Sequence, residues 1–509
     1  MKRPLTALLL SAALLLTACG QDIPEPPPEE IQVDDSAQIY EEPAPSQRLP
    51  ESFSLPYDPA VTLDPLTCPD GPHQTIGALL YEGLFALDES LQPQKVLCAD
   101  FSCDETKTVW TFRLRDDAIF SDGSQLTVTD AADSLNRARE TDRYRARLSK
   151  VTAITAEENA VTITLASPNA SFPALLDIPI VKTTKNNAVP LGTAPYCFAD
   201  TDDGAMLIAS PYRQADLPVD EIQLSPCSGS TALEYQFSSH RIQMMTADLT
   251  AQDAYQPEGS VQIHDADTTV LQFIGFNTAN PLFASPELRH ALGLGIDRQL
   301  LVSAHLAGHG TATQSPVSPA ALQYPETLDI VYSKTAFLDA MTHAGYNSGN
   351  AYQVTILVNG DNPFKVSVAR YIANALSVCD IQISVNALPW AEYCSALETG
   401  AFDLYYGEAR LTADWDLSAL VAAGGVLNYG NYANDGMNFL LAQYAAAEDT
   451  ADALRMLCRY LQAQAPILPL CFKATSVLTE SGIVEGLSPT AANPFHSLSG
   501  ITVHLALND

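Results

Sequence analysis

Residues 353–406 read QVTILVNGDNPFKVSVARYIANALSVCDIQISVNALPWAEYCSALETGAFDLYY, and their pattern alternates between strand and helix. The apolar run 353–358 is typical of a strand, and the alternation over 381–385 is typical of another. Between them, apolar residues recur at helical spacing, at Val368, Ile372, Ala375 and Cys379. We expect a helix at 391–399 and a strand at 402–406 to follow. This β-α-β-α-β order predicts a partly parallel sheet with right-handed crossovers.

Upstream of this stretch, further strands and a helix are indicated. Residues 110–115 (WTFRLR) alternate apolar and polar side chains, and residues 161–165 (VTITL) do so again after a turn at 157–159. Thr127 and Asp130 have the spacing of a capping box, which predicts the start of a helix. The chain is therefore expected to be an α/β protein.

The first residues predict export from the cytoplasm. Lys2 and Arg3 precede an apolar run over 5–16 that is too short to span a bilayer, and this pattern predicts a signal peptide over residues 1–18. Residues 16–19 (LTAC) resemble the bacterial lipobox, which implies a diacylglycerol thioether on Cys19. The alternative is an ordinary signal peptide followed by a chance cysteine.

Residues 19–50 are rich in Pro, Glu, Asp and Gln. Little of this segment can be buried, and its prolines keep it extended, so it predicts a disordered tether between the lipidated cysteine and the folded part. The expected location is extracytoplasmic, on the outer face of the cytoplasmic membrane or in the periplasm, with the membrane contacted through the Cys19 lipid.

Length, charge and cysteine content narrow the class of protein. The 509 residues are too many for one compact core, so two or three domains or lobes are expected. The formal net charge of -34 repels nucleic acid; it favours cationic ligands, or it is simply a solvated acidic surface. Nine cysteines remain after Cys19, an odd number that predicts at least one free thiol, although Cys98 and Cys103 have the spacing of a local disulfide.

Several blocks, in one order along the chain, resemble the family 5 extracellular solute-binding proteins of ABC importers, which include oligopeptide-, dipeptide- and nickel-binding proteins. The blocks are LDP at 63–65, YEGL at 81–84, WTFRLR at 110–115, FSDG at 120–123, PLGTAPY at 190–196, FNT at 276–278, IDR at 296–298, AGY at 344–346, FDL at 402–404 and APILP at 465–469. Ala194 stands where the family pattern has glycine. The resemblance covers nearly the whole chain after the tether.

The resemblance implies a periplasmic-binding-protein-like fold of two α/β lobes, class II-like and of cluster C, with an extra domain inserted in the first lobe. Carried onto this sequence, it predicts a first lobe of residues 51–77, 190–272 and 475–509. The inserted domain is expected at 78–189 and the second lobe at 273–474.

The function implied is the capture of a peptide between two hinged lobes and its delivery to ABC permease subunits, by a monomer that has no enzymatic activity and needs no cofactor or metal. Alternatives within the class are a nickel chelate, haem or an oligosaccharide as ligand. A sensory or chaperone-like surface protein on the same scaffold is a further alternative, and a hydrolase is the least favoured one.

A buried ligand ammonium group needs a carboxylate partner, because an unpaired buried charge is costly. In the resembled family this acid lies in an Ala-Asp-Tyr-like stretch, which is ADWD at 413–416 here. We expect Asp414 to bind the ligand's amino group, with Asp416 as second choice; the alternative is two acids on an ordinary exposed loop. Trp415 is either a pocket wall or a core residue.

Three more residues are candidate ligand contacts. Arg241 stands where the family has an acid, and its guanidinium would suit a ligand carboxylate, although an ordinary surface arginine is the simpler interpretation. Asn277 lies in the FNT block, and Trp390 is either a pocket or a core residue. His305 and His309 have the spacing of two metal ligands on one helix, but the neighbouring glycines indicate that the helix ends there.

Overall fold

The computed structural model describes residues 49–183, 189–202, 204–213, 215–251 and 254–506. The expected signal peptide, Cys19 and nearly all of the expected tether lie outside the described residues. Within the described part of the chain, no helix is long and apolar enough to cross a membrane.

The largest sheet has seven strands in the order β11-β17-β12-β16-β14-β15, with β13 paired to β17. Its strands are β11 (Met244–Ala247), β12 (Val261–Phe276), β13 (Gly310–Ala312), β14 (Tyr352–Asn359), β15 (Ile381–Leu388), β16 (Leu404–Arg410) and β17 (Ile467–Glu480). Strands β14, β15 and β16 are parallel, whereas β12 and β17 run antiparallel to their neighbours. The expected partly parallel sheet is therefore confirmed.

The helices of the β-α-β-α-β stretch are α7 (Pro363–Leu376) and α8 (Trp390–Thr399). The helical spacing predicts that Cys379 belongs to the first of these helices, and this prediction is wrong. Helix α7 ends at Leu376, and Cys379 lies beyond it with a φ of 54°. The chain must turn back within four residues to start β15 at Ile381, and a left-handed residue makes this turn. Helical spacing of Cys379 with Ala375 is therefore fortuitous.

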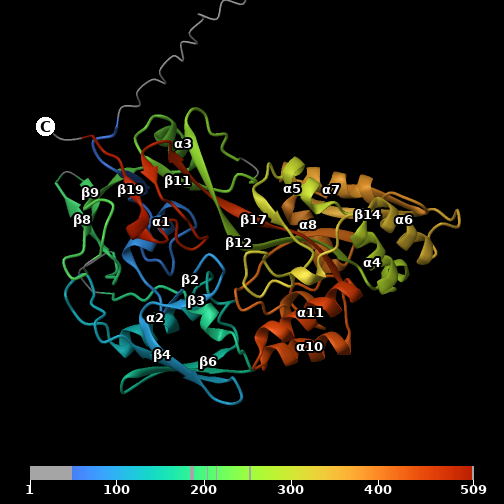
Figure 1. Cartoon of the computed structure of the whole chain (residues 1–509), viewed down its shortest axis with the longest axis horizontal. Coiled ribbons are helices and arrows are strands. Elements are labelled where there is room, and N and C mark those ends of the chain that lie inside the picture. Colours follow the sequence, from blue (N-terminus) through green and yellow to red (C-terminus); the bar gives the residue numbers. More distant parts are fainter. Residues whose placement is uncertain (1–48, 184–188, 203, 214, 252–253, 507–509) are drawn as a thin grey trace, which may run out of the picture. The chain divides into compact units, whose positions relative to one another are not determined.

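Strands β12 and β17 are long and lie side by side in the sheet (Figure 1). They pair from Val261 and Glu480 at one end to Gly275 and Ile467 at the other, and their register shifts between Asp267 and Leu271. Lys473 of β17 is 8% exposed at this irregularity, and its ammonium group meets Asp248 Oδ2 at 2.5 Å and Glu408 Oε2 at 3.8 Å. A buried cation thus links the segment after β11 to strand β16.

A separate four-stranded sheet, which we call the insert sheet, has the order β4-β5-β7-β6. Its strands are β4 (Cys98–Cys103), β5 (Val109–Leu114), β6 (Val151–Glu157) and β7 (Ala160–Leu165), and α2 (Val128–Glu140) packs on it. The strands expected at 110–115 and 161–165 are confirmed. The capping box is also confirmed, since the Thr127 hydroxyl accepts from the Asp130 amide and the Asp130 carboxylate accepts from the Thr127 amide.

A third sheet, β1-β10-β9-β8, and two small pairs complete the strand set. These strands are β1 (Ser54–Tyr57), β2 (Phe85–Leu87), β3 (Pro93–Lys95), β8 (Tyr196–Thr201), β9 (Gly204–Ala209), β10 (Glu221–Pro226), β18 (Val484–Glu485) and β19 (Thr502–Val503). The remaining α-helices are α1 (Pro72–Leu80), α3 (Ser230–Ser238), α4 (Pro286–Leu294), α5 (Arg298–His305), α6 (Lys334–His343), α9 (Ser418–Val421), α10 (Asp435–Ala445) and α11 (Thr450–Gln464). Their apolar faces pack into separate clusters around the sheets.

Two of the resemblance blocks, YEGL and PLGTAPY, lie against each other although about 110 residues separate them. The Glu82 carboxylate accepts from the Thr193 hydroxyl at 2.9 Å and pairs with Arg213 at 2.5 Å. A Cβ on Gly192 would lie 1.9 Å from the Leu80 carbonyl oxygen, so only glycine fits there. The contacts between these two blocks therefore join the segment after α1 to the segment before β8.

All nine cysteines of the described residues are free. Cys98 and Cys103 occupy the two ends of β4, and five residues of extended strand separate their Cα atoms by about 16 Å. A disulfide needs Cα atoms less than about 7 Å apart, so the local disulfide suggested by their spacing does not form.

Candidate functional site

Asp414 lies in the loop that follows strand β16 and is 3% exposed. Its carboxylate accepts from the Thr412 hydroxyl on one oxygen and from the Asn169 side-chain amide at 2.8 Å on the other. The Tyr444 hydroxyl donates to the Asp414 carbonyl at 2.6 Å and fixes the backbone of the loop. Burial raises the pKa of Asp414, because its hydrogen-bond donors are neutral and compensate its charge only in part.

Asp416 stands two residues further and forms an ion pair with Lys150. Its other carboxylate oxygen accepts from the Ser418 amide at 3.0 Å. Burial alone would raise the pKa of Asp416, but the Lys150 ammonium and the Ser418 bonds outweigh it and hold this pKa below its usual range. The two acids are thus close together but differ in their direct partners: Asp416 forms an ion pair with Lys150, whereas the side-chain donors to Asp414 are neutral.

Trp415 is the residue between the two acids, and its backbone is left-handed with a φ of 52°. Its indole is 1% exposed and meets the Phe472 ring edge-on at 6.1 Å between centroids. Because the left-handed residue turns the loop, the indole enters the core while both neighbouring carboxylates face polar partners. Trp415 is therefore a core residue that anchors the loop.

One polar partner of each acid, Asn169 for Asp414 and Lys150 for Asp416, comes from the loops at the insert sheet. Two hydrogen bonds fix Asn169 in place. Its backbone N–H donates to the Lys107 carbonyl at 3.0 Å, and its side-chain oxygen accepts from the Ser171 backbone N–H at 3.0 Å. Arg147 forms an ion pair with Asp177 close to Asp414, and burial lowers its pKa. Sequence reasoning missed these residues, since the strand pattern at 161–165 does not indicate which side chains at its ends meet a distant loop.

The structure places the other three candidate contacts elsewhere. The Arg241 guanidinium lies over the Tyr235 ring at 5.7 Å, as an ordinary surface arginine would. The Asn277 side-chain amide donates to the Gly400 carbonyl at 3.2 Å and the Phe402 carbonyl at 3.0 Å, so it holds two chain segments together. Trp390 is 57% exposed and stacks on Tyr393. None of these contacts is with Asp414 or Asp416, and the part of Arg241, Asn277 and Trp390 in ligand binding stays a prediction.

His305 and His309 have different partners. His305 ends α5 and lies 2.9 Å from the Ser367 hydroxyl, whereas His309 lies 2.9 Å from an Asp265 oxygen. Gly308, with a φ of 86°, separates them, as expected for a helix that stops there. Among the described residues, no group of three His, Cys, Asp or Glu side chains is placed to hold a metal ion.

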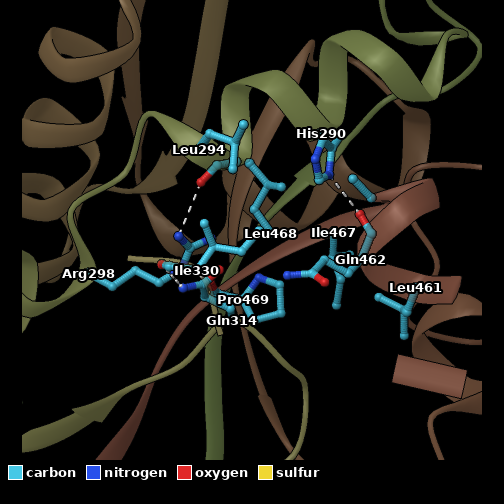
Figure 2. Close-up of a pocket in the computed structure, with 12 residues that line it drawn as sticks. His290, Leu294, Arg298, Gln314, Ile330, Leu461, Gln462, Ile467, Leu468 and Pro469 are labelled. Carbon is cyan, nitrogen blue, oxygen red and sulfur yellow. Dashed lines mark hydrogen bonds between the residues drawn. The ribbon is translucent and has the colours of Figure 1, made fainter. Parts of the chain in front are cut away.

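A small cavity lies where α4, the end of α11 and the start of β17 meet (Figure 2). It encloses about 30 Å³, room for about one water molecule. Arg298 donates from Nε to the Pro469 carbonyl at 2.7 Å, and His290 lies 3.1 Å from the Gln462 carbonyl. This cavity is too small for a peptide or a metal chelate. A wider, open hollow of about 440 Å³ is lined by His305, Ser367, Arg370, Tyr371, Asn374 and Ala375. The Asp414–Asp416 loop is the candidate site because the resemblance predicts it, and its contacts are those described above.

Comparison with known proteins identifies the class. Residues 92–425 match the model of the bacterial extracellular solute-binding proteins, family 5 Middle. The glutathione-binding protein GsiB of Escherichia coli O1:K1 / APEC is 24% identical over 428 residues, covering 78% of this chain and 83% of that protein. The MppA periplasmic murein tripeptide binding protein, in its unliganded open form, superposes with a TM-score of 0.72 at 16% identity, covering 90% of this chain and 98% of that one. NikZ from Campylobacter jejuni in complex with Ni(L-His) gives 0.62 at 16% identity, covering 89% and 99%.

The fold is therefore the two-lobed, mixed α/β periplasmic-binding-protein fold of cluster C. The chain belongs to the bacterial extracellular solute-binding proteins, family 5. Proteins of this family are extracytoplasmic, bind a peptide or another solute, and deliver it to an ABC permease; the family is one of binding proteins rather than enzymes.

Proposed function

We propose that this protein captures peptides between its two lobes, as a monomer, and that Asp414 binds the ligand's amino group. The observation that carries this proposal is the charge balance of the site. Asp414 is a buried carboxylate whose side-chain donors, Thr412 and Asn169, are both neutral. Such a group gains most from an added cation, and a peptide amino terminus supplies one with three N–H donors.

The relatives support a peptide as ligand. GsiB is named for glutathione and MppA for a murein tripeptide, and glutathione carries a free amino group. NikZ is in complex with Ni(L-His), so a metal chelate is the second candidate. The described residues favour the peptide, because the Asp414–Asp416 site contains carboxylates and no histidine.

The test is calorimetric titration of the whole mature chain, stripped of ligand by unfolding and refolding, with glutathione and defined di- to octapeptides. Asp414→Asn keeps the shape of the side chain but removes its charge, and we expect it to weaken binding by at least tenfold, about 1.4 kcal/mol. Asp435→Asn, in the exposed first turn of α10, is the matched control and should bind as the wild type does. Binding that Asp414→Asn leaves unchanged would reject the site assignment and keep the function. Binding of Ni(L-His) and of none of the peptides would reject the peptide function.

We also propose that the mature chain is held at the membrane by a lipid on Cys19. This rests on the lipobox-like residues 16–19 and on the Pro- and acid-rich segment that follows. Mass spectrometry of the amino-terminal peptide from a native membrane fraction should show a diacylglycerol on Cys19. A soluble wild-type protein whose Cys19 thiol is free would reject the anchor.

A further inference from the structure

Four direct contacts join one end of the insert sheet to the loops after β16 and α10; we call these eight residues the clasp. The contacts are Asn169 to Asp414 and Lys150 to Asp416 through side chains, the Ala170 amide to the Ala445 carbonyl at 2.8 Å, and Lys107 to Glu448 at 3.1 Å. All four place a charge or a donor on a specific acceptor across two regions far apart in sequence.

The clasp residues of the insert sheet share one end of that sheet. Val109 of β5 pairs with Thr164 of β7, and Val151 of β6 pairs with Leu165 of β7. The turn before β5, the residue before β6 and the loop after β7 are therefore neighbours. They hold Lys107, Lys150 and Asn169, respectively, so one end of the sheet presents Lys150 and Asn169 to the Asp414–Asp416 loop and Lys107 to Glu448.

Together, Lys150 and Asn169 offer the two acids what a ligand's amino group would offer. Lys150 supplies one positive charge to Asp416, and Asn169 supplies an N–H donor to Asp414. An ammonium group combines one charge with three N–H donors. Because Asp414 is 3% and Asn169 8% exposed, a ligand ammonium can reach the Asp414 oxygen only after Asn169 has left it.

We propose that Lys150 and Asn169 are an internal substitute for the ligand's cationic group, and that a ligand binds by displacing them from Asp414 and Asp416. The clasp is then an autoinhibitory contact, and Lys150 is a specificity-determining residue. Ligands without a cationic group cannot replace Lys150 and leave the clasp shut. The displacement step rests on the function proposed above; the clasp itself does not.

The clasp also predicts an effect on affinity. A binding-competent state that is only partly populated lowers the apparent affinity by its population. Loosening the clasp raises that population, so variants that lack the Lys150 charge should bind an amine ligand more tightly. Tighter binding without the Lys150 charge would identify Lys150 as an internal competitor of the ligand. If Lys150 were a ligand contact, its removal would weaken binding.

The experiment uses the full mature chain and two readouts. The first is amide hydrogen exchange of the peptide that contains Ala170, without any ligand, because the Ala170 amide bonds across the clasp. We expect Lys150→Met and Asn169→Ala each to accelerate its exchange at least fivefold. Arg113→Met is the matched control: Arg113 lies on β5 of the same sheet but outside the clasp, and it pairs with the exposed Asp100, so its loss should change exchange less than twofold.

The second readout is the affinity for glutathione and for trialanine. Lys150→Met should lower the Kd of whichever probe the wild type binds by about three- to tenfold. This is the change expected if the fraction of molecules with an open clasp rises by about three- to tenfold. Unchanged exchange in both clasp variants would overturn the clasp and leave peptide binding intact. Faster exchange with weaker binding would overturn the competition and make Lys150 a ligand contact. Failure of both probes on wild type and variants would reject the peptide function, and the displacement step with it.

Discussion

The side-chain amide of Asn169 donates to the carboxylate of Asp414 at 2.8 Å, across 245 positions of the chain. The bond is buried at both ends and joins the loop after β7 to the loop after β16. Together with the Thr412 hydroxyl, the Asn169 amide gives each Asp414 carboxylate oxygen a neutral donor. The experiments above test whether a ligand's amino group replaces this donor.

The pH dependence of stability should reveal the buried charge of Asp414. Burial raises its pKa above the unfolded value of about 3.8, so the unfolded chain releases this proton first as the pH rises. Its contribution to stability is therefore present at low pH and is lost between about pH 4 and the raised pKa. Asp414→Asn removes the loss, and each pKa unit corresponds to about 1.4 kcal/mol. Urea unfolding at pH 4 to 7 should show that the free energy of unfolding of the variant rises relative to that of the wild type as the pH rises. A difference between the two free energies that does not change with pH would contradict this.

Gly192 should not tolerate a side chain. A Cβ there would lie 1.9 Å from the Leu80 carbonyl oxygen and 2.6 Å from the Tyr81 ring, so the backbone would have to move. We expect Gly192→Ala to lower the free energy of unfolding by about 1–3 kcal/mol or more, as overpacking does. Gly500→Ala is the control, because its Cβ would meet nothing within 4 Å. Equal melting temperatures for the two variants would show that the block contact does not stabilise the fold.

Lys473 should matter for the two long strands. Its ammonium is buried against Asp248 and, more distantly, Glu408, and Lys473→Met would leave the partly exposed Asp248 without a cation. We expect a loss of about 1–2 kcal/mol in the free energy of unfolding, less than for a fully buried pair. Lys365→Met removes another cation that pairs with Glu408, at 3.3 Å, and should cost under about 1 kcal/mol. Denaturant titration compares the two, and an equal cost would reject a special role for Lys473.

Thiol titration should sort the cysteines by burial. Cys68, Cys98, Cys458 and Cys471 are buried, and burial raises the pKa of Cys98 to about 11 and those of Cys458 and Cys471 to about 12. Few of these thiols ionise at pH 8, so they should react with Ellman's reagent only in denaturant. The half-exposed thiols should react in the native protein.

The same titration in denaturant, without reductant, counts the thiols. Nine should react if Cys19 carries the lipid thioether and ten if it does not. A count that is lower by two would show a disulfide among the nine cysteines that the structure has free.

The local elements follow from the sequence because each depends on near neighbours. The alternation of residues 110–115 and the Thr127–Asp130 capping box specify β5 and the start of α2. The run from β14 to β16 follows from the same spacing rules. Cys379 is the exception, because the approaching start of β15 ends α7 earlier than the periodicity indicates.

The features of the candidate site also fall into two groups, those that depend on order along the chain and those that depend on packing. Order along the chain was enough to identify the family and to place Asp414 and Asp416 in one loop. The burial of Trp415 in the core, and the contacts of Asn169 and Lys150 with the two acids, could be found only in the folded chain. The contacts of Asn169 and Lys150 join residues that are more than 200 positions apart in the sequence. They depend on how one end of the insert sheet packs against the loop after β16, and no local pattern in the sequence records this packing.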